Sequence, residues 1–504
     1  MSSSPYLLVP LSPCRLWWAG ARKRACPTLR IWTFLIVGLF PPATSAIAAD
    51  EPPAQPKDET PIKKITIYPA AEPRPALRYR LLPPLIDLRP GNAAVFYNKA
   101  ALMARQQQGA DKQQNQASEW IELPLDRLPR GEVAATVRAW EGILQQVGYA
   151  VLREECDWQM PLREGFPYGI VLPEAQEMRS VVRILAVKAR LEIAEGRYDD
   201  AIETLRTGYT VARHVAQGPF FVHVLIGIAA ASVMTEQARE LAQQSGAPNL
   251  YWAYGSLPQP FISLDLANQY EKDSLFFWHP EWRDLDHQTW GPEGWQKIYD
   301  EMVDSLQEID SDQISEHRSL QVLGRAVQRY GHAKRWLIEH GSSAEAVELM
   351  PVAQVVVLYT VGLYNELSDE SMKWANLAYP EIVERWSAAE QAIHDEARKH
   401  EIIPFAGLLS GPYRHVRQAQ VRLERLFALE RTIEALRVYA AAHDGKLPKQ
   451  LADVTEAPVP GDPWMGGPFD YELQGETATL KARLPSDMSA KHLGVHYEIT
   501  VGEP

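Results

Sequence analysis

The sequence is poor in cysteine. Its 504 residues contain three, Cys14, Cys26 and Cys156. The first two lie in an N-terminal segment that we expect to be removed, which leaves Cys156 alone and excludes an internal disulfide. Neither early cysteine follows the apolar run of that segment, so we see no lipid-attachment site. We expect a hydrophobic core to hold the fold, with Cys156 as a small buried side chain and not a nucleophile.

The chain is also short of positive charge. It has 51 Lys and Arg residues against 64 Asp and Glu, a net charge of −13. Removal of the first 49 residues takes away five basic residues and no acidic one, leaving a net charge of about −18. Nucleic acids and anionic membranes are bound by basic surfaces, so the composition argues against both as partners.

The common catalytic and metal-binding motifs are missing as well. We find no intact nucleophile elbow, P-loop or zincin helix. His400-Glu401 begins like a zincin motif, but Pro404 stands where the second histidine belongs. The Glu390/His394 and Glu396/His400 pairs have the i, i+4 spacing of solvated surface pairs on a helix. We therefore expect neither a metal nor a cofactor.

The N-terminus carries an export signal. Five basic residues between Arg15 and Arg30 precede the apolar run of residues 31–40, and Ala46-Ile47-Ala48 forms a small-residue cleavage site. A run this short suits a signal peptide better than a membrane span of about 20 residues. We predict a signal peptide over residues 1–49, a Pro- and charge-rich linker over 50–64, and a periplasmic, envelope or secreted location. The alternative is an uncleaved anchor, which would be the only membrane attachment.

Residues 173–218 have the pattern of a helical hairpin. Val182, Leu185, Ala189 and Ile193 share one helical face, as do Tyr198, Ala201, Leu205, Tyr209 and Ala212 further on. Gly196 stands where the first helix must stop. The run from Glu195 to Leu205 resembles the turn and second helix of one tetratricopeptide repeat (TPR), without a second copy at the expected period. We predict a mainly α fold, an array of antiparallel helix pairs that is TPR-like or α-solenoid-like.

Other segments have helical periodicity or a polar loop composition. Gln106–Gln116 is polar and low in complexity, which predicts a loop, and Ser342–Glu345 has a capping-box pattern. The further predicted helices cover residues 92–108, 131–154, 220–244, 293–309, 311–340, 368–378, 380–400 and 412–443; the apolar helix at 220–244 is interrupted by charges, which favours a core helix over a membrane span.

Three short motifs together resemble a family of exported proteins common in planctomycete-type bacteria. They are Cys156-Asp-Trp158, the Glu195–Leu205 turn, and Gly246-Ala-Pro-Asn-Leu-Tyr-Trp252 followed by Leu257-Pro258. The resemblance implies a helical fold and an envelope location, and it carries no catalytic residues.

The C-terminal part of the sequence has a different pattern. A long helix leads through Gly445-Lys-Leu-Pro448 and Asp462-Pro-Trp464 into alternating segments at 469–473, 477–482 and 495–501, which predict strands. This pattern resembles the C-terminal half of a type II secretion pseudopilin, although the N-terminal transmembrane helix of that family is absent. We predict a helical domain over 65–411 and a second unit over 412–504, a long helix plus a small antiparallel β module.

Residues 276–295 form the best candidate site. They combine four tryptophans with acidic and histidine side chains: Trp278, His279, Trp282, Asp284, Asp286, His287, Trp290 and Trp295. Exposed indole rings stack on sugars or grip apolar peptides, and Asp and His add hydrogen bonds or acid–base chemistry. The alternative is a connection whose aromatic side chains fill the helical core.

Two functional hypotheses follow. The first is an exported, non-catalytic helical scaffold that binds a protein or peptide partner in a groove between helix pairs. The second is a hydrolase or carbohydrate-binding protein with its site around Trp278–Trp295. A component of a secretion apparatus is a third interpretation, which rests on the C-terminal analogy alone.

Overall fold

The computed structural model describes residues 60–164, 172–309, 316–405, 412–484 and 494–503. The predicted signal peptide and most of the predicted linker lie outside these residues. The described part is 64% helical, with fifteen α-helices and a small β-sheet, so the expected mainly α fold is confirmed. The helices are α2 (Ala94–Gln106), α3 (Ala110–Glu122), α4 (Arg130–Ala139), α5 (Glu141–Val151), α6 (Pro173–Ala194), α7 (Tyr198–Ala216), α8 (Phe221–Ala242), α9 (Tyr251–Gly255), α10 (Asp265–Trp278), α11 (Pro292–Ile309), α12 (Glu316–Glu339), α13 (Ala344–Leu349), α14 (Val352–Met372), α15 (Tyr379–His400) and α16 (Pro412–Ala442).

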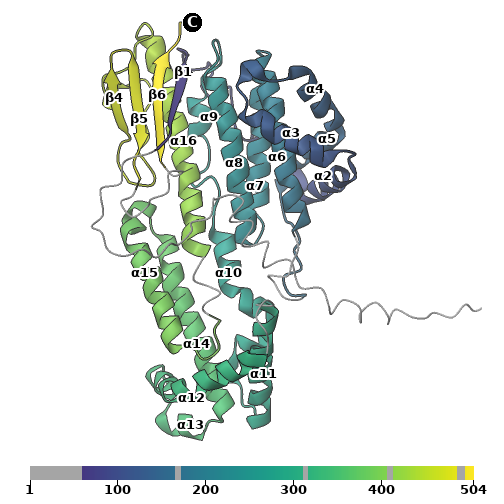
Figure 1. Cartoon of the computed structure of the whole chain (residues 1–504), viewed down its shortest axis with the longest axis vertical. Coiled ribbons are helices and arrows are strands. Elements are labelled where there is room, and N and C mark those ends of the chain that lie inside the picture. Colours follow the sequence, from purple (N-terminus) through teal and green to yellow (C-terminus); the bar gives the residue numbers. More distant parts are fainter. Residues whose placement is uncertain (1–59, 165–171, 310–315, 406–411, 485–493, 504) are drawn as a thin grey trace, which may run out of the picture.

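Three hydrophobic cores divide the molecule. The largest joins α2–α8 with the first half of α16, the second lies among α10–α15, and the third lies between α16, α9 and the sheet. Figure 1 shows the consequence: the sheet and α2–α9 form a broad upper part, and α11–α14 form a narrower lower end. The helix α16 contributes to two cores, so it ties the sheet to the helical body.

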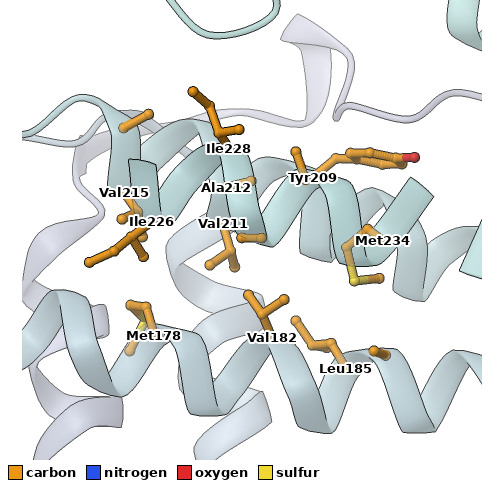
Figure 2. Packing of buried hydrophobic residues seen from close by; sticks show 14 of the residues in the cluster. Met178, Val182, Leu185, Tyr209, Val211, Ala212, Val215, Ile226, Ile228 and Met234 are labelled. Carbon is orange, nitrogen blue, oxygen red and sulfur yellow. The ribbon is translucent and has the colours of Figure 1, made fainter. Parts of the chain in front are cut away.

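The hairpin at the centre forms where the sequence predicts it. The first helix, α6, ends at Ala194, Gly196 takes a φ of 73°, and α7 starts at Tyr198. Figure 2 shows the packing: Met178 and Val182 of α6 face apolar side chains of α7 and α8. A methyl group on Gly227 of α8 would lie 2.5 Å from the carbonyl oxygen of Ala212. Glycine is therefore what lets α7 and α8 approach so closely.

The apolar helix α8 lies inside the helical body. It is the one helix of the described residues that is long and apolar enough to cross a membrane, and two thirds of its most apolar stretch is buried within the protein. Its Arg239 pairs with Glu430 of α16, with Nη2 and Oε1 2.5 Å apart and both side chains almost fully buried. The predicted core helix is confirmed.

Two predictions for residues 92–155 are wrong. The polar segment predicted as a loop contains the start of α3, since Ala117 and Trp120 give that helix a buried edge. The single helix predicted over 131–154 breaks at Trp140 into α4 and α5 and ends in a short strand, β3 (Arg153–Glu155). The Trp140 ring is fully buried and its Nε1 donates to Gln113, 2.8 Å away, which fixes the break. The strand β3 pairs in parallel with β2 (Arg89–Asn92).

The lower end follows the predicted helices with shifted boundaries. Ser343 is the N-cap of α13 and its hydroxyl accepts from the Ala346 N–H at 3.1 Å, as the capping pattern predicts. The helix predicted at 368–378 is instead the last turn of α14 and a 3₁₀ turn. The reason is that buried residues recur along the helix from Val355 to Ser371, so α14 continues through this segment without a break.

The C-terminal strands form as predicted, as β4 (Asp470–Gln474), β5 (Thr477–Ala482) and β6 (Val495–Val501). The sheet has a fourth strand, β1 (Ile62–Ile67), in the order β1-β6-β5-β4. The strands β4, β5 and β6 pair antiparallel, as predicted for the C-terminal module, and β1 adds a strand parallel to β6, so the whole sheet is mixed. The predicted linker ends within this strand, whose Ile65 and Ile67 are buried in the third core.

Buried ion pairs along α16 hold the sheet and its loops to the helices. The Arg425 guanidinium binds Asp462 in the loop before β4, with Nη2 2.6 Å from Oδ2. Arg437 pairs with Glu434 at 2.8 Å and donates to the carbonyls of Tyr68 and Ala247. Removing one partner of such a pair leaves an unpaired buried charge, so these contacts fix α16 against its neighbours.

Candidate functional site

The tryptophan-rich stretch joins the end of α10 to α11 through two 3₁₀ turns, η4 (Pro280–Trp282) and η5 (Leu285–His287). Trp282 and Trp295 are fully buried in the second core, and Trp278 and Trp290 pack against it half-buried. The rings of Trp290 and Trp295 meet edge to face, with centroids 5.2 Å apart. Stacking on a ligand needs exposed rings. Two of the four rings of this stretch are instead buried in the core.

The acidic residues and one histidine of the stretch do not lie with the buried rings. Asp284, Asp286 and His287 are exposed on the 3₁₀ turns. They make no convergent group with the buried rings, and the described residues contain no cluster of three or more His, Cys, Asp or Glu side chains that could hold a metal ion. Ligand binding by these residues stays a prediction, and the structure gives it no open aromatic face at Trp282 or Trp295.

Among the predicted residues, His279 lies in a polar arrangement. Its Nε2 lies 2.9 Å from the Oγ of Ser305 on α11, and its Nδ1 lies 3.2 Å from Oε1 of Glu281. The imidazole stacks on the buried Trp282 ring, with centroids 3.8 Å apart and planes inclined by 8°. Sequence reasoning missed Ser305, which stands 26 residues away on the next helix and has no local signal.

These three side chains have the order of a nucleophile, a base and a group that orients the base. The chemistry needs the serine to give its proton to the histidine. Instead, the Ser305 hydroxyl donates to the carbonyl of Glu301 at 2.7 Å, so its proton is directed away from the imidazole. Ser305 is also only 4% exposed. The arrangement acts as a polar link between η4 and α11.

A second polar cluster lies in the largest core. The Tyr97 hydroxyl lies 2.9 Å from Nδ1 of His214, and the indole N–H of Trp158 donates to the His214 carbonyl at 2.9 Å. Burial lowers the pKa of His214 to about 4 and that of His223, on the next helix, to about 4. Burial also raises the pKa of Tyr97 well above its usual value, so its hydroxyl stays protonated beside the neutral His214.

Cys156 lies beside this cluster and is no nucleophile. Burial, followed by the charge of Asp157, raises the pKa of its thiol well above the usual value. The thiolate is the reactive form, so this side chain is inert at neutral pH. The expectation of a small buried side chain is confirmed.

A shallow pocket of about 480 Å³ opens at the turn of the central hairpin, between the 78–79 segment and the 246–248 loop. Arg197 lines it and is engaged by Glu195 at 2.6 Å and Asp200 at 2.7 Å. Arg78 lies 3.7 Å from Asp199. The arginines that line the pocket are thus paired with neighbouring carboxylates, so the pocket offers no excess charge to a ligand.

Exposed apolar side chains gather at the lower end of the molecule. We call the set Leu320, Leu323, Val327, Ile338, Leu349 and Val352 the tip surface; its members come from α12, the end of α13 and the start of α14. Val327 is 76% exposed and Leu349 is 86% exposed. Lys334 of α12 pairs with Glu348 at 2.7 Å, which brings the two parts of the surface together. Figure 1 shows α12 and α13 at the end farthest from the sheet.

Comparison with known proteins adds no identification: no family model, curated protein or solved structure matches the chain. The function must be argued from the structure itself.

Proposed function

We propose that this chain is an exported, non-catalytic helical scaffold that binds a protein partner through the tip surface. Soluble proteins scatter exposed apolar residues singly, and a contiguous group of them marks an interaction site. Leu320, Leu323 and Val327 lie at i, i+3 and i+7 of one helix, so they share one face. That shared exposed face is the observation that carries the proposal.

Export and the pairing of helices belong to the same proposal. The N-terminal sequence supports a periplasmic or envelope location, and the TPR-like turn at Gly196 supports a scaffold built from helix pairs. In such a scaffold, the large core of α2–α8 and the sheet supply rigidity and the lower end supplies the contact.

The test compares two matched sets of surface substitutions. The tip variant carries Leu320→Gln, Leu323→Gln and Val327→Gln; the control carries Leu85→Gln and Ile86→Gln, which are also strongly exposed but lie on η1 (Leu85–Asp87). Each protein is cross-linked within the cell envelope of its source, and the linked peptides are identified by mass spectrometry.

We expect the wild type and the control to give links from α12 to one recurrent partner and the tip variant to lose them. If the three proteins give the same links, or none from α12, the proposal is wrong. Circular dichroism of the tip variant checks that the helices are intact, because these side chains make few contacts within the chain.

The second candidate is a hydrolase, favoured by the Ser305–His279–Glu281 distances. It predicts turnover of an activated ester that is abolished by Ser305→Ala. We expect no turnover by either protein, because the Ser305 proton is engaged by the Glu301 carbonyl. Turnover that depends on Ser305 would replace the scaffold proposal.

A further inference from the structure

The helix α12 has two apolar faces, and the fold uses one of them. Val322, Ala326, Ala333 and Leu337 are buried in the second core. The other face follows steps of four and three residues along the whole helix, through Leu320, Gly324, Val327, Gly331, Lys334 and Ile338. Steps of this kind place side chains in one stripe with the heptad spacing of a seam between packed helices. We call this stripe the α12 seam.

The α12 seam contains two glycines that no close contact among the described residues requires. A Cβ atom built on Gly324 or Gly331 would meet no atom within 4 Å. Glycine weakens a helix relative to alanine, so its presence at an exposed helical position is a cost without a benefit in the isolated protein.

Elsewhere in this protein, glycines in helices do serve close contacts. A Cβ on Gly362 of α14 would lie 2.2 Å from the Trp336 ring of α12, and one on Gly208 of α7 would lie 2.6 Å from Met234. By the same logic, Gly324 and Gly331, seven residues apart on the α12 seam, leave room for a helix that approaches from outside the chain.

The charge of α12 indicates which kind of partner helix would bind the α12 seam. The helix has five Lys and Arg residues and two acidic ones, in a chain whose net charge is −13. Arg325 and Arg335 have no carboxylate at ion-pair distance among the described residues. The exposed Arg335 lies beside the α12 seam, at the place where acidic residues flanking a partner's apolar stripe would meet it.

We infer that the α12 seam binds an amphipathic helix of a partner protein whose apolar stripe is flanked by acidic residues. The inference rests on the proposed function, since it names the kind of partner that the tip surface takes. Leu320, Val327 and Ile338 supply the apolar contacts, Gly324 and Gly331 allow the close approach, and Arg335 pairs with a flanking carboxylate.

The test uses a synthetic helical peptide of about four heptads with Leu and Ile on its stripe and Glu in the flanking positions. A second peptide has Lys in place of every flanking Glu. Binding of each labelled peptide to the full protein is measured by fluorescence anisotropy at low and physiological salt. We expect the Glu peptide to bind at least about tenfold more tightly than the Lys peptide, with an affinity that falls as salt rises.

A glycine variant separates binding from folding. Gly324→Gln with Gly331→Gln fills the space over the α12 seam with side chains that favour a helix. We expect its melting temperature to stay level or rise while its affinity for the Glu peptide falls at least about tenfold. The control is Gly148→Gln on α5, where a Cβ also meets nothing within 4 Å; it keeps the affinity of the wild type.

Other results overturn the inference. Equal binding of the two peptides, or wild-type affinity in the glycine variant, refutes it. Self-association that the glycine variant abolishes would assign the α12 seam to a second copy of this chain, and variant-sensitive binding to phosphatidylglycerol vesicles would assign it to a lipid surface. If the Glu peptide fails but the cross-links from α12 persist, the kind of partner is wrong and the scaffold function stands; if both fail, both are wrong.

Discussion

The two buried histidines of the largest core make the stability of this protein depend on pH. His214 and His223 each have a pKa of about 4 in the folded protein, against 6.5 for an unperturbed imidazole. Both rings are neutral in the fold and become protonated in the unfolded chain as the pH falls below 6.5. The folded state therefore loses stability from pH 6.5 downwards, and the loss is complete below about pH 4.

The magnitude follows from the two pKa values. Each pH unit below 6.5 costs about 1.4 kcal/mol per histidine until the folded imidazole itself takes up a proton. At about pH 5, each histidine thus costs about 2 kcal/mol, and the pair costs about 4 kcal/mol. This is a large share of the roughly 5–15 kcal/mol by which domains are stable.

The assay is urea unfolding at about pH 7.5 and about pH 5, with the difference in unfolding free energy as the readout. His223→Leu removes one titrating ring from the core, so we expect its difference to be smaller than that of the wild type by about 2 kcal/mol. Carboxylates contribute equally to this pH difference in the wild type and in the variant, so their contribution cancels when the two are compared. His287→Leu, at an exposed histidine, is the matched control and keeps the wild-type difference.

Identical pH differences for the wild type and His223→Leu would refute the reasoning, because the His223 ring would then be protonated as easily in the folded as in the unfolded protein. The Nδ1 atom of His223 is buried and has no hydrogen-bond partner among the described residues. The Phe220 backbone favours the charged ring, but burial outweighs it and lowers the pKa of His223, which is why we expect the neutral form.

Three further predictions test the architecture. Trp282→Phe should leave the amount of acrylamide-quenchable tryptophan emission unchanged, because the lost ring is fully buried; a loss of quenchable emission would mean that this ring is at the surface. Arg425→Leu strands the buried Asp462 carboxylate and should cost about 3–5 kcal/mol in urea unfolding, much of it recovered by adding Asp462→Leu; a cost near zero would mean that water reaches the pair. Ile67→Ala should cost about 2–5 kcal/mol if β1 is part of the sheet core, and nothing if residues 62–67 are a linker.

The sequence predicted those elements whose signal is local. The strands β4–β6 alternate over five to seven residues, and the central hairpin carries its own stop at Gly196. The pairing of β1 cannot be read from local sequence, because Ile65 pairs with Ile499, which follows the whole helical body in the sequence. The helix α3 was missed because only Ala117 and Trp120 of its residues are buried, too few for a visible period.

The candidate site shows the same limit. The composition of residues 276–295 identified a cluster of aromatic and polar side chains, but exposure depends on what packs over them. Trp282 lies against Phe405, and His279 bonds Ser305, both from segments that no pattern in the stretch specifies. The α12 seam was accessible to sequence reasoning, since Gly324 and Gly331 stand one heptad apart between Leu320 and Ile338, but its exposure was not.

The position of the sheet relative to the tip surface bears on the proposed contact. The strand β1, which follows the predicted export segment, and the C-terminal strand β6 lie side by side in the sheet. Buried ion pairs fix that sheet to α16, and the tip surface lies at the opposite end of the molecule. If the export segment stays in a membrane as an anchor, the sheet is the end nearest to it, and α12 points away. In that case the proposed contact at the tip surface would be made with a partner that is not part of that membrane.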